Sequence, residues 1–436
     1  MININLREER KEARYFAVYP RIVPTGEVSR IYIKSLFAEM SFEDDKKYEV
    51  TYKPKAFSTE REKKSSERKF KLKPKNGVLE IEQYFSGEQE HILIIEEKVE
   101  GELIQIGKFH IYSLQPDLFA RRPLKGDLHL HSCRSDGEGS PAYMMALGRK
   151  IGFDFIALTD HGQYQPSQEA IKAYEDIDLD LLLVHGEEVH PPDSDNHLVN
   201  FGGNYSVNQL YTREEEKYEK EIREIIDSTD FIPEGVDEYE YASFVWSSEQ
   251  IKKADGLAIF CHPYWVAGDQ FYISEKLTSF LLKKQPFAAL EIINGSISLE
   301  ANQLQVRKYF AHISTDNFSG TMPVVGVSDA HHCDLGSGYS LVFAESKTRE
   351  DIIKSIKQNF SLAVENQNGG FPRFYGSDRL VKYAYFLQRE VFPEHDKLCF
   401  EEGSCMVDLI TEKEGSKSKL ENLSGRVDHL YQKYWK

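Results

Sequence analysis

The chain has 436 residues, of which 40% are hydrophobic and 12% aromatic, enough for folded cores in two to four domains. Its formal net charge of −17 argues against strong nonspecific binding of nucleic acid, which depends on Lys and Arg replacing phosphate counterions. No apolar run is long enough to span a membrane, and the N-terminal residues lack the apolar segment of a secretory signal. Five scattered cysteines without a CxxC pair are typical of free thiols, so we expect a cytoplasmic protein without membrane association.

The first 122 residues contain short segments rich in β-branched and aromatic residues, separated by polar turns. This pattern predicts an antiparallel β-sandwich of immunoglobulin type, without its disulfide, as a domain over residues 1–122. The predicted strands include SRIYIKSLF (29–37), KYEVTYKP (47–54), VLEIEQYF (78–85), HILIIEEKV (91–99) and IGKFHIYSL (106–114).

A basic segment interrupts this region. Residues 55–75, KAFSTEREKKSSERKFKLKPK, carry nine basic and three acidic residues. Two interpretations remain open, a solvated basic hairpin or loop and an anion-binding patch.

From residue 123 to 365, apolar strand-like segments alternate with helical patterns. This alternation predicts an α/β domain with a largely parallel sheet, and the number of units favours a closed β/α barrel. The predicted strands are GDLHLH (126–131), FDFIALTD (153–160), LLLVHGEEV (181–189), HLVNFGG (197–203), LAIFCHP (257–263), AALEIIN (288–294), MPVVGVSD (322–329) and SLVFAES (340–346). The predicted helices are 141–151, 166–176, 207–227, 247–254, 274–283, 299–312 and 348–358. We expect residues 366–436 to form a helical extension packed on the barrel.

Histidines gather at the ends of the predicted strands. Ten of the fourteen lie between residues 129 and 332. The C-terminal strand ends of a β/α barrel form one rim, so side chains far apart in the chain can converge there. Alternate residues of a strand share a face, which turns His129 and His131 inward together. Neutral imidazoles and carboxylates suit Mn, Fe and Zn without a thiolate, so we interpret Cys133, Cys261 and Cys333 as packing residues.

Six fragments in a fixed order resemble the PHP (polymerase and histidinol phosphatase) superfamily. They are DLHLHSCRSDG (127–137), LTDH (158–161), GEE (186–188), HLVNFG (197–202), CHP (261–263) and SDAHH (328–332). The resemblance covers roughly residues 124–345 and implies a distorted (β/α)7 barrel that holds two or three divalent metal ions, Mn, Fe or Zn, at its rim.

The resemblance also implies a ligand set. Its nine members are His129, His131, Asp136, His161, Glu188, His197, His262, Asp329 and His331. The family's glycine-x-glutamate pattern selects Glu188 over Glu187, and Glu188 would bridge two metals. One metal would take His129, His131, Glu188 and Asp329, a second Glu188, His197 and His262, and a third Asp136, His161 and His331. The complete set favours three metals and an active enzyme.

The implied activity is metal-dependent phosphoester hydrolysis, by a phosphatase or a phosphodiesterase. Metal ions lower the pKa of water from about 16 to about 7, which supplies hydroxide for attack on phosphorus. Glu188 and Asp329 would then be catalytic as well as metal-binding. Either His332 or a metal-bound water would protonate the leaving group, and His332 could equally be a surface residue. Arg134 would either bind a phosphate bidentately or face solvent.

Several alternatives accompany this prediction. The expected substrate is a small phosphate ester or a short oligonucleotide. A second possibility is a hydrolase or phosphodiesterase directed at a polymer or glycan, with the β-sandwich and residues 55–75 as its targeting module. A third is a metal-binding regulatory protein without turnover. We expect residues 228–250 to be a loop that shapes the site, with its aromatics either packed against the barrel or stacked on a nucleobase.

Three further residues with ionisable side chains lie near the predicted rim. Glu291 ends a strand and could hydrogen-bond a ligand imidazole. His185 and His190 flank the glutamates but match no family position, so we interpret both as structural.

Overall fold

The computed structural model describes residues 15–315, 322–367 and 371–435, which form two compact units. The N-terminal unit contains described residues 15–122 together with 382–395 and 426–435. The second unit contains 123–381 and 396–425, apart from the residues outside the described ranges. Within these ranges, no helix is both long and apolar enough to cross a membrane.

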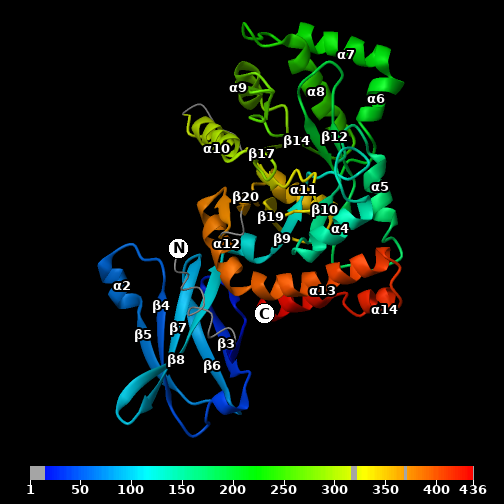
Figure 1. The fold of residues 1–436 in the computed structure, drawn as a ribbon. Coiled ribbons are helices and arrows are strands. Elements are labelled where there is room, and N and C mark those ends of the chain that lie inside the picture. Colours follow the sequence, from blue (N-terminus) through cyan, green and yellow to red (C-terminus); the bar gives the residue numbers. More distant parts are fainter. Residues whose placement is uncertain (1–14, 316–321, 368–370, 436) are drawn as a thin grey trace. The chain divides into compact units, whose positions relative to one another are not determined.

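Two sheets build most of the N-terminal unit (Figure 1). The smaller sheet has the order β1-β3-β6 and the larger β2-β8-β7-β4-β5. Every pairing is antiparallel except that of β2 with β8, which is parallel. The strands are β1 (Phe16–Tyr19), β2 (Ile22–Pro24), β3 (Glu27–Ser35), β4 (Tyr48–Pro54), β5 (Arg68–Leu72), β6 (Val78–Phe85), β7 (Gln89–Val99) and β8 (Glu102–Leu114).

One hydrophobic core lies between the two sheets. Ile31 and Ile33 of β3, Ile81 of β6, and Leu93 and Ile95 of β7 belong to it and are fully buried. Alternation along β6 buries every second residue, as expected for a strand with one face on a core. The five predicted strands are therefore confirmed as strands, and the immunoglobulin-type topology remains a prediction.

Two sheets also organise the second unit, with the orders β11-β10-β9-β19-β20-β21 and β12-β13-β14-β17-β18. A third, two-stranded sheet pairs β15 with β16. The strands are β9 (Arg122–Asp127), β10 (Phe155–Ala157), β11 (Leu182–Val184), β12 (Gly186–Val189), β13 (Leu198–Phe201), β14 (Leu257–Phe260), β15 (Val266–Ala267), β16 (Gln270–Phe271), β17 (Ala289–Asn294), β18 (Val324–Val327), β19 (Gly338–Ala344), β20 (Ser361–Glu365) and β21 (Arg373–Tyr375).

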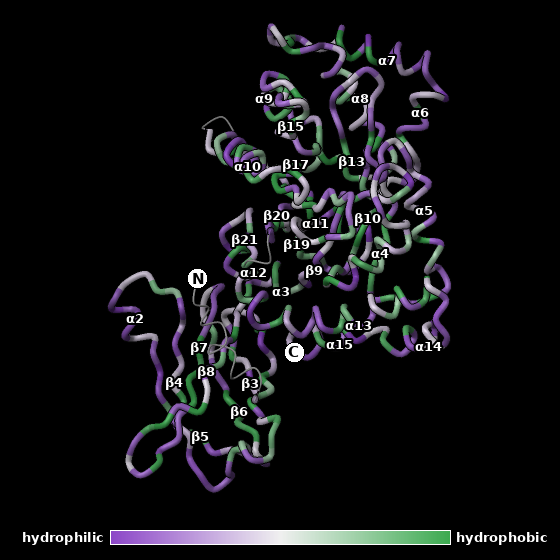
Figure 2. The backbone as a smooth tube through the Cα atoms, viewed as in Figure 1, coloured by the Kyte–Doolittle hydropathy of each residue, from purple (hydrophilic) through white to green (hydrophobic). Residues whose placement is uncertain are grey.

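Helices occupy most of the connections between these strands (Figure 1). Many begin at a side chain that caps the first turn: Ser274, Ser298 and Thr348 accept hydrogen bonds from backbone amides of α9, α10 and α11. Helix α7 is coloured mainly hydrophilic in Figure 2, and Tyr218 and Ile222 are its buried residues. The helices are α4 (Pro141–Lys150), α5 (Gln165–Lys172), α6 (Asn208–Arg213), α7 (Glu215–Ser228), α8 (Glu238–Lys253), α9 (Glu275–Lys284), α10 (Leu299–Ile313) and α11 (Arg349–Lys357).

The two large sheets of the second unit are mixed and not largely parallel, and the closed (β/α)7 barrel remains a prediction. Strand β13 pairs antiparallel with both β12 and β14, and β20 pairs antiparallel with β19 and β21. Two isolated bridges, Leu130 with Ala330 and His161 with Glu188, join the two sheets. The alternating pattern identified the segments, but it could not reveal their direction because strands buried on both faces are uniformly apolar in either direction.

The loop that we predicted over residues 228–250 is partly helical. Helix α8 begins after Asp237, whose carboxylate accepts hydrogen bonds from the amides of Tyr239 and Glu240. Its side chains Tyr241, Phe244 and Trp246 are buried in a hydrophobic core, so packing is their role. Most aromatic residues of this segment therefore belong to helix α8, whereas Phe231 precedes the helix and is exposed.

The C-terminal extension is helical but divided between the two units. Residues 382–395 and 426–435 pack with the N-terminal unit, and 396–425 with the second unit. Strand β21 also lies beyond residue 365 and pairs with β20. The extension contains α12 (Asp378–Glu390), α13 (Phe392–Ile410), α14 (Ser416–Glu421) and α15 (Arg426–Tyr434).

Candidate metal centre

His129 and His131 follow β9 and face the same way, as their spacing predicted. The chain stays extended beyond the strand, because Asp329 donates its amide to the carbonyl of His129 at 2.8 Å and His131 donates its own to Ala330 at 3.0 Å. The intervening Leu130 is fully buried in the opposite direction. Backbone pairing with residues 329–330 thus brings two distant segments together at the centre.

The remaining predicted ligands lie at or beyond other strand ends. His161 follows β10, Glu188 lies on β12, His262 follows β14, and Asp329 and His331 follow β18. His197 directly precedes β13, which runs antiparallel to its neighbours and so presents its first residues at the same edge. All nine predicted residues therefore lie in one cluster.

The first group of close atoms surrounds one oxygen of Asp329. Asp329 Oδ1 lies 3.3 Å from His129 Nε2 and 2.9 Å from His131 Nε2. Glu188 Oε2 lies 3.5 Å from His129 Nε2 and 3.6 Å from His131 Nε2. These are the distances expected between atoms that share one ion at ordinary metal–ligand bond lengths of about 2.0–2.2 Å.

The second group gathers on the other oxygen of Glu188. Glu188 Oε1 lies 3.0 Å from His197 Nδ1 and 3.3 Å from His262 Nε2. The same carboxylate therefore borders both groups.

The third group is a triangle of equal sides. Asp136 Oδ2, His161 Nε2 and His331 Nε2 are each 3.4 Å from the other two. Three ligand atoms at one separation can coordinate a common ion.

Several buried atoms of the cluster make no well-directed hydrogen bond among the described residues, although they lie close to other ligand atoms. They are His129 Nε2, His131 Nδ1, Glu188 Oε2 and His197 Nδ1. Buried polar atoms are rarely left unpaired, so such a concentration requires an explanation. Three of the four are atoms of the first two groups, and a bound divalent cation would satisfy them. The nitrogen and oxygen donors fit Mn, Fe or Zn.

Electrostatics keeps the two buried carboxylates and His197 in their metal-binding protonation states, whereas neighbouring carboxylates raise the pKa of His129, His161 and His262, whose imidazoles must be neutral to bind a metal. Burial opposes the ionisation of Glu188, but His129 and His197 beside it hold the pKa of its carboxyl well below the usual range. Burial also opposes ionisation of Asp329, and His129 and His131 again lower the pKa of that carboxyl. Burial lowers the pKa of His197 to about 4, so its imidazole is neutral at pH 7.

The backbone is strained at two ligand positions. His262 has a φ of 22° and Asp329 a φ of 48°. Each such conformation costs on the order of 1–3 kcal/mol for a residue other than glycine, and it persists where the surrounding structure requires it. The strain turns these two side chains into the cluster at the points where their strands end.

A second layer orients the ligands. Glu291 Oε2 lies 3.1 Å from His129 Nδ1, and its Oε1 accepts the amide of His262 at 3.1 Å. Asn294 donates to Glu291 at 2.8 Å and to Asp329 Oδ2 at 2.9 Å. Glu291 thus contacts a ligand imidazole, as we predicted. Partners of this kind fix ring orientation in metal sites.

Two functional residues were missed in the sequence analysis. Asp160 Oδ1 accepts the amides of Ser132 and Ser135 at 2.9 and 3.0 Å, which holds the loop that carries Asp136. His190, interpreted as structural, places Nε2 2.8 Å from His161 Nδ1 and stacks on His197 with ring centroids 4.0 Å apart. The position of Asp160 next to the predicted ligand His161 in LTDH could have indicated its role. The position of His190 in the sequence gave no such indication.

Two predicted catalytic residues are turned to solvent. The guanidinium of Arg134 binds Glu169 bidentately at 2.9 and 2.7 Å, so a carboxylate occupies the face that a phosphate would use. His332 has a side chain 71% exposed and lies 3.0 Å from Glu138. The solvent-facing interpretation therefore fits Arg134, and the surface interpretation fits His332.

Glu187 points away from the cluster, in agreement with the choice of Glu188. Its carboxylate accepts hydrogen bonds from Asn200, Ser206 and the amide of Val207 at 3.0, 2.6 and 2.6 Å. Cys261 lies beside His129, but burial raises the pKa of its thiol, so the sulfur stays protonated. All five cysteines are free.

The chain is similar to several known proteins. Residues 127–273 match the family model of the PHP domain. A curated relative, the DNA polymerase/3'-5' exonuclease PolX of Bacillus subtilis, is 43% identical over 53 residues, which are 12% of this chain and 9% of the relative. The match thus spans less than a tenth of that protein.

Two solved structures share weaker similarity. One is a two-domain protein containing predicted PHP-like metal-dependent phosphoesterase from Bacteroides vulgatus, 18% identical, with a TM-score of 0.37 and coverage of 56% of this chain and 65% of the other. The second, from Bifidobacterium adolescentis, is provisionally assigned as a metal-dependent phosphoesterase; it is 16% identical, with a TM-score of 0.33 and coverage of 48% and 90%. At these scores the similarity supports no argument about chemistry.

The family match and the geometry concern the same side chains. Seven of the nine clustered residues lie inside the matched range, and Asp329 and His331 lie beyond it. The resemblance seen in the sequence is thereby confirmed over residues 127–273, which match the PHP domain model.

Proposed function

We propose that the protein is a metal-dependent phosphoesterase that hydrolyses phosphate esters at a three-metal centre. The observation that carries this proposal is the arrangement of nine nitrogen and oxygen ligands in three close groups. The first two groups share Glu188, and the third lies beside them through the 2.5 Å contact of His161 Nδ1 with Glu188 Oε2.

Three metals fit the groups better than two. His129, His131, Glu188 and Asp329 would hold the first ion, and Glu188, His197 and His262 the second. Asp136, His161 and His331 would hold the third, because their three ligand atoms lie 3.4 Å from one another. The side chain of Asp136 is 55% exposed, so the third ion would lie nearest to solvent.

Bound divalent ions would supply hydroxide near neutral pH and neutralise the charge that develops on phosphate oxygens. The chain's own residues prepare that chemistry. Glu188 presents one oxygen to each of two groups, and Glu291 and Asn294 fix the orientation of His129 and Asp329. Asp160 holds the loop that positions Asp136.

The proposed substrate is a small phosphate ester or a short oligonucleotide, and we place the enzyme in the cytoplasm. Whether monoesters or diesters react depends on the space beside the metal ions. His332 is exposed and paired with Glu138, which favours water over His332 as the proton source for the leaving group.

The polymer-directed alternative rests on the basic segment of the N-terminal unit. Within it, Lys63, Lys69 and Lys71 pair with glutamates, whereas Arg61, Lys64, Arg68, Lys73 and Lys75 have no ion-pair partner among the described residues. Strand β5 lies at an edge of the larger sheet. A variant with Arg68→Glu and Lys73→Glu would distinguish this function from that of a small-ester phosphoesterase. The polymer-directed function predicts that the rate of hydrolysis of a polyanionic substrate falls while the rate on small esters is unchanged.

The experiment that tests the proposal starts from chelator-treated protein. We expect no hydrolysis of 4-nitrophenyl phosphate or of its bis ester until manganese is added, and saturable turnover afterwards. Binding of manganese without turnover on either ester would instead support a regulatory protein. Undiminished turnover in the stripped protein would contradict the proposal.

A further inference from the structure

The centre has two unlike borders. Beyond Asp136 and His331, the neighbouring side chains are polar and exposed, and include His332 paired with Glu138. Beyond His197 and His262, the neighbouring side chains are Trp265 and Tyr272. A substrate that extends past its phosphate in the second direction therefore meets aromatic rings.

Trp265 and Tyr272 form a pair at the base of a hairpin. Tyr272 donates its amide to the carbonyl of Trp265 at 2.9 Å, which extends the pairing of β15 with β16 by one position. The turn uses Gly268 and Asp269, both with positive φ. The two rings lie 4.7 Å apart, so the hairpin fixes them as one unit.

Both rings contact proposed ligands of the second ion. Trp265 lies 5.8 Å from the ring of His262 and 6.3 Å from that of His197, and Tyr272 lies 5.6 Å from His197, all between centroids. Both residues are half-buried, so each keeps part of its surface accessible. The indole N–H of Trp265 has no hydrogen-bond partner in the described part of the chain.

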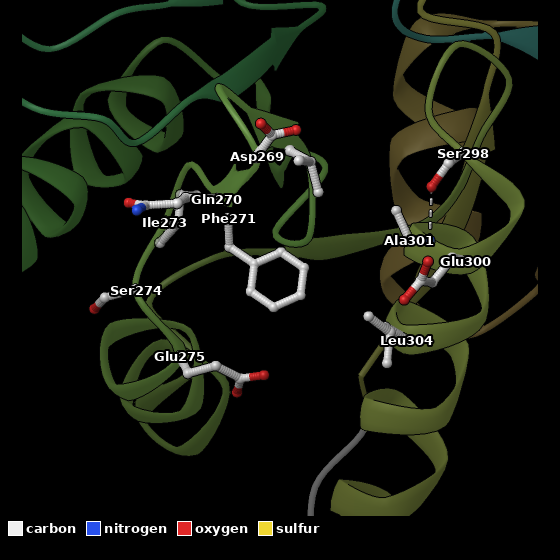
Figure 3. Close-up of a pocket in the computed structure, with 11 residues that line it drawn as sticks. Asp269, Gln270, Phe271, Ile273, Ser274, Glu275, Ser298, Glu300, Ala301 and Leu304 are labelled. Atoms are coloured by element: carbon white, nitrogen blue, oxygen red, sulfur yellow. Dashed lines mark hydrogen bonds between the residues drawn. The ribbon is translucent and has the colours of Figure 1, made fainter.

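The next aromatic residue of the hairpin faces the other way. Phe271 packs its ring 5.3 Å from that of Tyr264. It lines a cavity of about 520 Å³ between the first turns of α9 and α10 (Figure 3). One strand thus presents Tyr272 to the centre and Phe271 away from it, as alternation requires.

We propose that Trp265 and Tyr272 are specificity-determining residues that bind a planar, aromatic group attached to the scissile phosphate. This inference rests on the proposed phosphoesterase function and names its substrate class. Trp265 and Tyr272 contact His197 and His262, which themselves contact Glu188, and aromatic contacts of the kind proposed contribute about 0.5–1.5 kcal/mol beyond the buried area. The free indole N–H can donate to an oxygen of the same group.

The test compares benzyl phosphate with ethyl phosphate, each as the monoester and as the methyl diester. Benzyl and ethyl alcohol are both released as primary alkoxides, so a difference in kcat/KM between the two esters reports binding of the benzyl ring beside the metal site. We expect the kcat/KM for the benzyl ester to exceed that for the ethyl ester about tenfold. In Trp265→Ala this preference should fall to about twofold or less, through KM for the benzyl ester, and Trp265→Phe should restore most of it.

Phe271→Ala is the matched control, because it removes an aromatic ring from the same hairpin on the opposite face. It should leave the benzyl preference unchanged. Equal hydrolysis of benzyl and ethyl esters by the wild type, or equal loss of both in Trp265→Ala with metal content retained, would overturn the inference and leave the phosphoesterase intact. Loss of metal in Trp265→Ala would also overturn it, by showing a structural role. No hydrolysis of any ester by manganese-loaded wild type would instead overturn the proposed function.

Discussion

Each unit buries a carboxylate near histidines, and the two carboxylates are compensated differently. In the N-terminal unit, Glu90 contacts His110 at 2.7 Å, Arg389 at 2.8 Å and Lys55 at 2.5 Å. In the second unit, Glu188 is fully buried, and its close titratable neighbours among the described residues are imidazoles. A buried charge is costly unless it is paired or coordinates a metal.

The histidines differ in the same way. His91 is fully buried with both ring nitrogens partnered, by Tyr52 at 2.9 Å and Ser113 at 2.7 Å. His129 is equally buried, yet its Nε2 lacks a partner among the described residues. The N-terminal network is complete within the protein, whereas the centre is complete only with bound cations. This difference separates a structural polar network from a ligand site.

The largest expected effect comes from Glu188→Gln, which keeps the size of the side chain and removes the charge shared by two groups. We expect turnover on 4-nitrophenyl phosphate to fall by about 10³-fold or more, as when one group that stabilises transition-state charge is removed. Metal content measured on the same preparation should fall as well. A variant with near-normal turnover would show that Glu188 is not at the reacting centre.

The matched change in the other unit is Glu90→Gln. It leaves Arg389 and His110 without their carboxylate, which should destabilise the N-terminal unit by about 3 kcal/mol in chemical unfolding. Turnover and metal content should be retained. If Glu90→Gln lost metal, or Glu188→Gln lost stability alone, the comparison between the two carboxylates would fail.

The pH dependence of the N-terminal unit follows from His91. Burial lowers the pKa of His91 from 6.5 to about 3, so the unfolded chain takes up this proton first as the pH falls. Stability from this residue is complete above pH 6.5 and is lost towards pH 3, by about 2 kcal/mol between pH 7 and 5. Unfolding curves of wild type and His91→Gln at both pH values check this. Equal pH dependence in both proteins would contradict the account.

A smaller effect is expected at the loop that carries Asp136. Asp160→Asn weakens the acceptor of two backbone amides and should lower the affinity for the most weakly bound metal by about 10–100-fold, as second-layer changes do. Titration with manganese measures it. Ser135→Ala serves as the control, because it removes one hydroxyl donor to Asp160 and leaves the backbone bonds in place.

The smallest effects are expected for Arg134→Ala and His332→Ala. Both side chains are largely exposed and paired with surface glutamates, and such pairs contribute about 0–1 kcal/mol. We expect kcat/KM to change by less than about twofold. A larger loss for Arg134→Ala would restore its predicted role on the phosphate.

The sequence predicted the clustered residues better than it predicted the sheet. Because His129 and His131 are two residues apart, the strand pattern placed both side chains on the same face of the strand. The ordered fragments identified the other seven residues of the cluster. Strand direction was not predicted, because β13 is buried along its whole length and its sequence does not indicate which way it runs. Its antiparallel course explains why His197 precedes a strand instead of following one. The first part of helix α8, residues 238–246, was taken for a loop because its buried face is broad, with serines between the aromatics, whereas its last part lies in the helix predicted over 247–254.

Residues whose roles depend on three-dimensional neighbours escaped prediction. His190 reaches His161 only because β12 lies against β10, which the bridge between His161 and Glu188 shows. Arg134 was a reasonable phosphate contact in the sequence, but Glu169 of α5 lies within its reach. The division of the C-terminal extension between two units likewise depends on packing that periodicity does not encode.

The most direct test of the central claim is a count of metal ions per chain, combined with their positions from anomalous scattering in crystals of protein loaded with manganese. The account predicts three ions, one in each group of ligands, with Glu188 touching two of them. Fewer than one ion per chain under metal-replete conditions, or ions bound away from these side chains, would contradict it.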